Sequence, residues 1–473
     1  MSIISKQLSS EVAYSLPDRW AWKTIEEIAY TTSGGTPSRS NLAYFDGSIP
    51  WVKSGELEDN YIEATEEHIS EIGLKESSAK LFPQGTVLVA LYGATIGKTG
   101  ILKVEATTNQ AICGLTPKNN SFIPEYLAQW IRYQRPNLVA QSSGGAQPNI
   151  NQGIIRRFLV PLPPLNEQHR IVARLESILA QTKTARAALE RVPELLKAFR
   201  QSVLAAAFRG ELTERDPNDE PASVLLERIR AGRRRRWEET LRAKGKDPAR
   251  VVYEEPLAPD TSKLPELPEG WVWTTLDLLL ERIEAGHSFK AQGRPAQEGE
   301  LGVIKVSAMT WGKFLPEENK ALFPDTDPGI TPRVCKGDLL ISRANTVELV
   351  GAVVLVEEDY PCLFLSDKSL RLVPITEEVS KEFLLYALRT RQVRDEFEGE
   401  ATGVSESMRN ISQDKIRIAP IALPPLHEQA MIIQKIKHAN ALSGSIALAI
   451  ETGTCRLVEL EQSALTKAFR GEL

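Results

Sequence analysis

The amino-acid sequence predicts an α+β protein made of two tandem copies of one unit, each a globular domain followed by a long helix. Three observations support this prediction: motifs that occur twice in the same order, short β-type segments in the first part of each copy, and a heptad-like apolar pattern in the second part. We expect the two helices to separate the domains and to form an antiparallel coiled coil with pseudo-two-fold symmetry.

The repeated motifs lie at both ends of each copy. Each motif returns 251 to 261 residues later, in the same order. The matching pairs are Leu16–Trp22 with Leu267–Trp273, Val52–Gly55 with Lys305–Ala308, Asn149–Gln152 with Asn410–Gln413, Leu162–Gln168 with Leu423–Gln429, and Gln201–Leu212 with Gln462–Leu473. Because the ends match closely and the middles have diverged, the sequence indicates one scaffold that carries two different surfaces.

The first part of each copy, residues 1–165 and 265–426, is predicted to be an α+β domain. Short apolar runs bounded by glycine, such as Gly85–Gly93 and Gly337–Ser342, are typical of strands. The two tryptophans of each opening motif are two residues apart, so on a strand they share one face. We expect these tryptophans to anchor the core, because aromatic side chains bury a large area.

The second part of each copy, residues 166–212 and 427–473, is predicted to be a long helix. Apolar residues follow steps of four and three from Ile171 onward, with the polar Thr182 as an interruption. The same positions 261 residues later, from Ile432 through Leu460, form a weaker pattern that is still mostly small or apolar. Each helix would be about 60 Å long at 1.5 Å per residue.

Signals for the ends and for a weak point accompany this pattern. Asn166 is expected to cap the first helix, and Gly210 to end it. Pro193 interrupts the first helix, and Gly453 with Thr454 lies at the matching depth of the second. The sequence therefore predicts a kink or local break in each helix.

An unrepeated segment, residues 213–264, links the two copies. Its stretch Arg228–Arg250 holds ten basic residues against three acidic ones. Two interpretations stay open for this stretch: a solvated helix face, or a contact with the phosphates of DNA.

Composition excludes several classes of protein. The net charge is −5, so any contact with nucleic acid must come from local patches. Four cysteines without a CxxC pair and only five histidines argue for a cytoplasmic protein and against a structural zinc site. No run of 18 apolar residues predicts a membrane span, and the N-terminus does not read as a secretory signal.

No motif in the sequence indicates catalysis. Gly93–Thr99 (GATIGKT) resembles a P-loop, but three residues separate its glycines where that motif needs four. The sequence also lacks the Asn/Asp-Pro-Pro-Tyr/Phe motif of amino-methyltransferases, and the HExxH and GxSxG motifs. We therefore expect a protein that is not an enzyme and has no metal and no cofactor.

The repeated motifs resemble a known family, the specificity (S, HsdS) subunits of type I restriction-modification systems. The resemblance rests on Leu16–Trp22, the turn Gly34–Pro37, Leu162–Gln168 and the Phe-Arg-Gly-Glu-Leu end of both helices, and it covers nearly the whole chain. In the second copy Gly286–Phe289 stands where the first copy has Gly35–Ser38. The resemblance implies two target-recognition domains, each reading one half of a bipartite, asymmetric DNA target.

The same resemblance implies the partners. They are double-stranded DNA, two modification subunits that bind S-adenosylmethionine and methylate adenine, and restriction subunits that translocate and cleave DNA with ATP. This chain would supply only the choice of sequence. The alternatives are a stand-alone DNA-modifying enzyme, which the missing catalytic motifs disfavour, and a structural coiled-coil adaptor, which the two divergent surfaces disfavour.

We expect polar residues of the divergent middles to contact DNA. Arginine can bind guanine through two hydrogen bonds, asparagine and glutamine can bind adenine, and lysine and serine more often contact phosphate. In the first domain the candidates are Thr36, Arg39, Lys53, Ser54, Tyr92, Thr95, Lys98, Gln147, Asn149 and Asn151. In the second domain they are Lys305, Ser307, Arg343, Asn345, Thr346, Lys368, Asn410 and Gln413.

Overall fold

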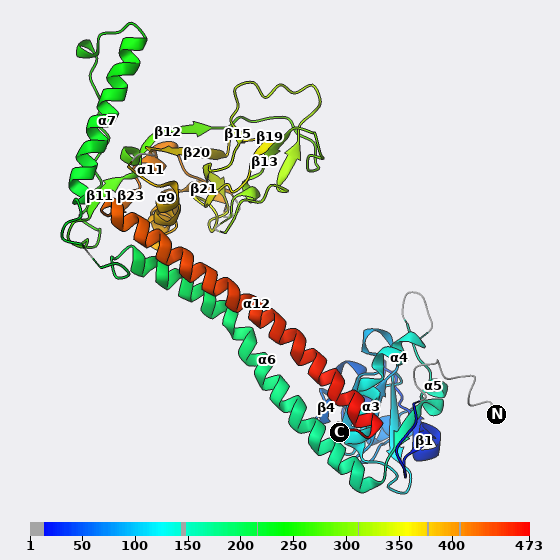
Figure 1. Cartoon of the computed structure of the whole chain (residues 1–473). Helices are drawn as coiled ribbons and strands as arrows, with labels where there is room; N and C mark the ends of the chain where they lie inside the picture. Colours follow the sequence, from blue (N-terminus) through cyan, green and yellow to red (C-terminus); the bar gives the residue numbers. More distant parts are fainter. Residues whose placement is uncertain (1–13, 143–147, 215, 311, 376–377, 406–407) are drawn as a thin grey trace. The chain divides into compact units, whose positions relative to one another are not determined.

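The computed structural model describes residues 14–142, 148–214, 216–310, 312–375, 378–405 and 408–473, and they form a mixed α+β fold with two long helices (Figure 1). These helices are α6 (Leu165–Ala207) and α12 (Leu426–Arg470). The chain divides into two compact units, Met1–Arg191 with Ala449–Leu473, and Val192–Leu448. Each unit therefore contains its own globular part and one portion of each long helix.

The first unit is built on a five-stranded sheet and a three-stranded sheet. The larger sheet has the order β2 (Ala29–Ser33), β9 (Ile112–Pro117), β6 (Val87–Ala90), β7 (Thr99–Leu102), β4 (Asn60–Ile62), and the smaller has β5 (Glu67–Ile69), β3 (Ile49–Val52), β8 (Thr107–Thr108). Strand β6 is apolar throughout because both of its faces are covered. Val87 and Val89 pack into one core cluster, and Leu88 and Ala90 pack into another.

The second unit is also built on two main sheets, but their numbers of strands differ from those of the first unit. One four-stranded sheet has the order β12 (Leu280–Ala285), β20 (Ser369–Pro374), β16 (Leu339–Ser342), β18 (Val353–Leu355). The other has β14 (Asn319–Ala321), β13 (Gly302–Ile304), β19 (Tyr360–Phe364), β15 (Arg333–Val334). A three-stranded ribbon adds β17 (Ala344–Asn345), β22 (Met408–Asn410) and β21 (Thr402–Ser405). Strand β16 corresponds to β6, since its residues also alternate between two core clusters.

Shorter helices accompany the sheets of each unit. In the first unit they are α1 (Ile25–Ile28), α2 (Glu71–Lys75), α3 (Pro124–Tyr133), α4 (Arg135–Ala140) and α5 (Gln152–Arg157). In the second unit they are α7 (Ala222–Ala243), α8 (Leu276–Leu279), α9 (Lys381–Leu388), α10 (Arg391–Glu400) and α11 (Gln413–Arg417). Helix α7 lies in residues 213–264, the segment predicted to link the two copies.

In each unit the two end motifs of one copy meet in an antiparallel ribbon. Strand β1 (Ala21–Thr24) pairs with β10 (Leu159–Leu162), and β11 (Val272–Thr275) pairs with β23 (Pro420–Leu423). Trp20 and Trp271, which precede β1 and β11, are buried, and Trp22 and Trp273 are partly buried against the same core clusters. The predicted role of these tryptophans as core anchors is confirmed.

Each long helix ends at a glycine as predicted, but the first one does not begin at the predicted cap. Helix α6 begins at Leu165, so Asn166 lies inside the first turn, and the carbonyl of Pro164 accepts from the amides of Glu167 and Gln168. The prediction that Asn166 caps the helix is therefore wrong. Gly210 and Gly471 have positive φ angles of 72° and 73°, as the left-handed residue after a helix requires.

Neither long helix breaks at its weak point. Helix α6 is continuous through Pro193, and α12 is continuous through Gly453 and Thr454, so there is no local break in either helix, and the predicted kink stays a prediction. At Pro193 one backbone donor is missing, which long flanking helical stretches tolerate because packing supplies most helical stability. In α12 the hydroxyl of Thr454 donates to the carbonyl of Ile450 at 2.9 Å.

Within the first unit the helical segments run in opposite directions. Ile171 and Leu175 of α6 share a core cluster with Ala468 and Phe469 of α12. Farther along α6, Arg186 forms an ion pair of 3.1 Å with Glu461. Beyond that pair, a Cβ built on Gly453 would lie 3.7 Å from Cδ1 of Leu189.

Burial follows the predicted apolar pattern only in part. In the second unit Ile432 and Ile436 are buried, as the pattern predicts. Thr182 and Ser443, which occupy matching positions of the two helices, are also buried although they are polar. Phe199 and Leu460 belong to the predicted pattern, but their side chains are 42% and 50% exposed.

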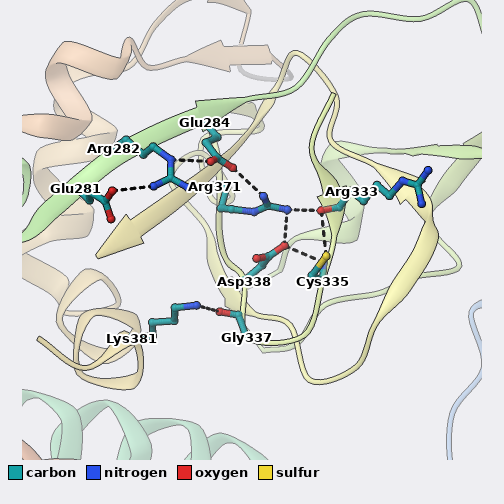
Figure 2. A network of polar contacts seen from close by, with 9 residues as sticks. All are labelled: Glu281, Arg282, Glu284, Arg333, Cys335, Gly337, Asp338, Arg371 and Lys381. Atoms are coloured by element: carbon teal, nitrogen blue, oxygen red, sulfur yellow. Dashed lines mark hydrogen bonds and ion pairs between the residues drawn. The ribbon is translucent and has the colours of Figure 1, made fainter. Parts of the chain in front are cut away.

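A network of ion pairs fixes the sheet edge of the second unit (Figure 2). Arg371 on β20 contacts Glu284 on β12 at 2.7 Å and Asp338 at 2.7 Å, and it also donates to the carbonyl of Arg333. Asp338 accepts from the amide of Cys335 at 2.8 Å. Burial raises the pKa of Asp338, against the opposing effects of that amide and of Arg371.

We expect Arg371→Met to destabilise the second unit by about 3–5 kcal/mol, because it leaves two largely buried carboxylates without their shared cation. The side chains of Arg371 and Asp338 are only 16% and 11% exposed. Arg282→Met is the matched control, since Arg282 also pairs with Glu284 but is 53% exposed. That change should cost about 0–1 kcal/mol. Urea unfolding of the full chain measures both, and equal losses would contradict the role of Arg371.

Candidate nucleic-acid interface

Four polar segments converge at one edge of the first unit. They are joined by backbone hydrogen bonds through the loop between β8 and β9. Thr108 and Ala111 accept from the amides of Gly35 (2.9 Å) and Leu91 (2.8 Å), and Asn109 donates to Val52 at 3.0 Å. Leu91 in turn accepts from Ile150 at 2.9 Å. These bonds place the glycine turn, the turn at Lys53, the end of β6 and residues 148–151 around one loop.

Three of these segments are joined in the same way in the second unit, and Asn345 joins the fourth, the turn after Lys305, since its side chain donates to the carbonyl of Val306 at 3.3 Å. In the loop between β19 and β20, the carbonyl of Leu365 accepts from the amide of His287 at 3.3 Å, and the carbonyl of Lys368 accepts from the amide of Arg343 at 3.0 Å. Arg343 accepts from the amide of Ile411 at 2.9 Å. All eight candidates of the second domain lie on these segments, so the structure brings them together.

The structure corrects the predicted alignment of the two copies by one residue. Lys53 precedes the single turn η3 (Ser54–Glu56), and Lys305 precedes η6 (Val306–Ala308). Each lysine pairs at 2.7 Å with a glutamate 13 residues later, Glu66 or Glu318. Lys53 therefore corresponds to Lys305, whereas the motif alignment matched Lys305 to Val52.

The glycine turn shows the same correction. A Cβ on Gly34 would lie 2.3 Å from the carbonyl oxygen of Thr108, and a Cβ on Gly286 would lie 2.2 Å from that of Leu365. In each unit the backbone of the glycine turn approaches the corresponding loop too closely for any side chain, so both positions require glycine. Gly34 therefore corresponds to Gly286. The sequence alignment had matched Gly286 to Gly35.

Several candidate cations already have carboxylate partners. Arg39 pairs with Glu67 at 2.6 Å and also lies 4.4 Å from the ring centre of Phe45. Lys53 contacts Glu66 and Glu67, and hydrogen bonds to these two residues raise the pKa of Lys53. In the second unit, hydrogen bonds from Lys305 and Ser307 lower the pKa of Glu318. To bind phosphate these side chains must exchange one anionic partner for another.

Other candidates have a role in local structure. Thr36 donates to Gln110, Thr95 donates to the carbonyl of Tyr92 at 2.8 Å, and Asn151 caps helix α5. Asn345 is buried and donates to the carbonyl of Val306 at 3.3 Å. The pKa of Glu348 is lowered first by a backbone hydrogen bond and then by a hydrogen bond from the side chain of Thr346.

The remaining candidates are the strongest for an outside ligand. Among the described residues, no hydrogen bond or ion pair engages the side chains of Ser54, Lys98, Asn149, Arg343, Lys368, Asn410 or Gln413. Tyr92 is 39% exposed and pairs through its backbone with Asn149. Gln147 lies outside the described residues.

The prediction from sequence missed residues that share this surface. A hollow in the second unit is lined by Lys305, Ser307 and Lys368 together with His287, Lys320 and Asp367. In the first unit Gln110 holds Thr36 and sits in the central loop. The signal for Gln110 was weak, because the loops before β9 and β20 have different lengths and no motif aligns them.

The described residues contain no group of three or more His, Cys, Asp or Glu placed to hold a metal ion. Within the same residues, no helix has the length and apolar character needed to cross a membrane.

Comparison with known proteins adds a family to this geometry. Residues 17–193 match the family model described as the type I restriction modification DNA specificity domain. The EcoEI specificity subunit of Escherichia coli is 25% identical over 90% of this chain and 78% of its own length. The EcoKI specificity subunit of Escherichia coli (strain K12) is 24% identical over 98% of this chain and 90% of its own length.

The chain is similar to type I restriction-modification specificity subunits over most of its length.

Solved structures agree with the fold of this chain. The HsdS subunit from Thermoanaerobacter tengcongensis has a TM-score of 0.61 at 19% identity, with 98% of this chain and 100% of that chain covered. A chain from a structure described as showing assembly and conformational transition of the type I R-M system has a TM-score of 0.65 at 20% identity, with the same coverage. At these identities the likeness concerns the fold.

We expect Gly286→Ala to disturb the glycine turn, because its Cβ would overlap the backbone of Leu365 and Ser366. Forced displacement of packed atoms costs about 1–3 kcal/mol. Gly293→Ala is the matched control, since no atom lies within 4 Å of its added Cβ. Thermal unfolding and hydrogen exchange in residues 365–368 measure the effect. Similar behaviour of both variants would show that the turn tolerates a side chain.

Proposed function

We propose that this chain is the DNA-specificity subunit of a type I restriction-modification complex, and that each of its two domains reads one half of a bipartite, asymmetric DNA target. The names of its relatives support this role, since they are specificity subunits of type I restriction enzymes. The family model is likewise described as a DNA specificity domain.

One observation carries the proposal: matched backbone positions hold different side chains in the two units. Leu91 and Arg343 make the same two backbone hydrogen bonds, to the loop before β9 or β20 and to residue 150 or 411. The loop residues in these bonds are Ala111 in one unit and Lys368 in the other. One backbone frame thus carries Leu91, which is buried, and Ala111 in the first unit, but two cations in the second, so the two units present different side chains, as readers of unlike half-sites require.

The unpaired side chains suit the grooves and the backbone of DNA. The guanidinium of Arg343 can donate two hydrogen bonds to guanine, and the amides of Asn149, Asn410 and Gln413 can pair with adenine. Lys98, Lys368 and Ser54 are suited to phosphate oxygens. The partly neutralised Arg39, Lys53 and Lys305 would join them by exchanging their carboxylate partners for phosphates.

The proposed organisation follows the repeat. Residues 1–165 and 265–426 form the two target-recognition domains, and residues 166–212 and 427–473 form the helices that separate them, with 213–264 between the copies. Antiparallel pairing of these helices would give pseudo-two-fold symmetry and two half-sites. Half-sites near one helical turn apart would lie on the same face of DNA. The opposite chain directions of α6 and α12 within the first unit support this pairing.

The chemistry in this proposal belongs to partner subunits, and the chain itself is not catalytic. Modification subunits would methylate adenine, and restriction subunits would translocate and cleave DNA. Since its ligand is DNA, the proposal places the chain in the cytoplasm.

We expect Arg343→Ala to weaken target binding by about 1–3 kcal/mol, roughly 5- to 150-fold, and to relax specificity at one position of one half-site. Arg391→Ala is the control, because Arg391 is 92% exposed on α10 and outside the interface. The assembled complex is titrated with DNA that carries its methylated motif. If affinity and motif both stay unchanged, Arg343 does not read a base.

We expect replacement of residues 1–165 by the domain of a relative to change one half-site and leave the other. The replacement should keep Tyr126 and Trp130, which pack on Phe469. Sequencing of methylated sites in cells that carry the hybrid reports both half-sites. A swap that alters both halves would refute two separate readers. Replacement of residues 265–426 is the reciprocal control.

A further inference from the structure

The basic segment between the two copies is left without a role by the proposed function. Its inner half, the first turns of α7, is anchored on the second unit. Leu225, Leu226 and Ile229 are buried in the same core cluster as Leu276 and Leu279. The segment predicted to be a linker therefore contributes to the core of this unit.

A polar contact sets the orientation of this helix. The guanidinium of Arg233 donates to the carbonyls of Asp277 and Leu280, the latter at 2.8 Å, and contacts the carboxylate of Asp277 at 3.3 Å. Asp277 also pairs with Arg417 of α11, at 2.5 Å. Because α11 begins at Gln413, a single carboxylate links α7 to the element that carries a candidate DNA contact.

The outer half of α7 and the residues after it, 234–250, form what we call the basic arm. It holds seven basic and three acidic residues, in a chain whose net charge is −5. Arg234 and Arg242 share one carboxylate, that of Glu238, at 3.6 and 3.0 Å. Arg235, Lys244 and Lys246 are exposed, and no described residue pairs with their side chains.

The basic arm is folded rather than a loose tether. The chain returns along α7 through the turn η5 (Pro248–Arg250). Trp237 packs on Tyr253 with ring centres 5.1 Å apart, and Arg234 lies over the same tyrosine ring. In Figure 1 this returning segment lies beside the outer end of α7.

The exposed charges face away from the anchored side. Arg235 and Arg242 are seven residues apart and share a helix face, roughly opposite the face of Leu226 and Ile229. Favourable pairing with the negative end of the helix explains cations only in the last turn. Arg234, Arg235 and Arg236 lie two turns earlier, so the helix dipole does not account for them.

We propose that the basic arm binds the phosphate backbone of double-stranded DNA beside the second domain, without reading its sequence. This inference rests on the proposed function. Double-stranded DNA carries one negative charge per about 1.7 Å of axis, which the excess of exposed cations over carboxylates in the arm matches. A protein partner would require an apolar centre, whereas no large exposed apolar side chain lies within residues 234–250, and the nearest along the chain are Val224 before it and Val251 after it.

The test removes three charges from the basic arm: Arg235→Gln, Arg242→Gln and Lys246→Gln together. The matched control removes three exposed cations elsewhere in the second unit: Lys263→Gln, Lys336→Gln and Arg391→Gln. Both variants are assembled with the modification subunits. Dissociation constants are measured over a series of KCl concentrations, for a duplex with the methylated motif and for one of equal length without it.

We expect the arm variant to lose the same factor of affinity for both duplexes, at least tenfold at low salt. The slope of log affinity against log salt should fall by roughly 0.9 per lost phosphate contact, and the methylated motif should stay the same. The control variant should keep a slope close to that of the unmodified complex.

Three results would overturn the inference: an unchanged slope, a loss confined to the duplex with the motif, or a complex that no longer retains its modification subunits. The last would assign the basic arm to a protein contact. The proposed function is judged separately, by whether the unmodified complex prefers the duplex with the motif. The salt slope of the arm can still be read if that preference is absent, because both duplexes report it.

Discussion

The structure depends on one constraint: each globular part closes its core with the end of the long helix from the other copy. In the first unit Phe469 is buried among Tyr126, Trp130 and Tyr133, with ring centres 4.9 to 5.5 Å away. In the second unit Phe208 packs on Phe383 with ring centres 5.6 Å apart. The Phe-Arg-Gly-Glu-Leu motif therefore occurs twice because two cores need it.

The glycine in this motif makes the contact possible. A Cβ on Gly471 would lie 2.5 Å from Pro17, and a Cβ on Gly210 would lie 2.5 Å from Pro268. Both prolines belong to the opening motif of a copy, beside the buried Trp20 and Trp271. The positive φ that ends each helix also lets its last residues turn onto the opening motif. The repeated motifs are thus the two sides of one contact, made once in each unit.

A scaffold held in this way leaves the loop edges free to vary. The backbone bonds around Leu91 are reproduced around Arg343, although the side chains differ completely. Base recognition needs such freedom at groove-facing positions and rigidity beneath them. In the second unit the rigidity comes from Arg371 and its two carboxylates, and Asp277 extends it to α7 and α11.

The sequence by itself determined the repeat, the α+β class, the two long helices and the tryptophan anchors, because local pattern and duplication encode them. It also selected the segments that converge in each unit, but it could not place Lys53 opposite Lys305 or Gly34 opposite Gly286. Because the loops between the motifs differ in length, residues of the two copies cannot be matched there from the sequence. Their backbone hydrogen bonds in the folded structure show which residues correspond. The tertiary structure alone decided which candidate side chains are free. Whether Lys305 meets Glu318, or Arg343 meets no carboxylate, depends on strands brought together by folding and not on their neighbours in the chain.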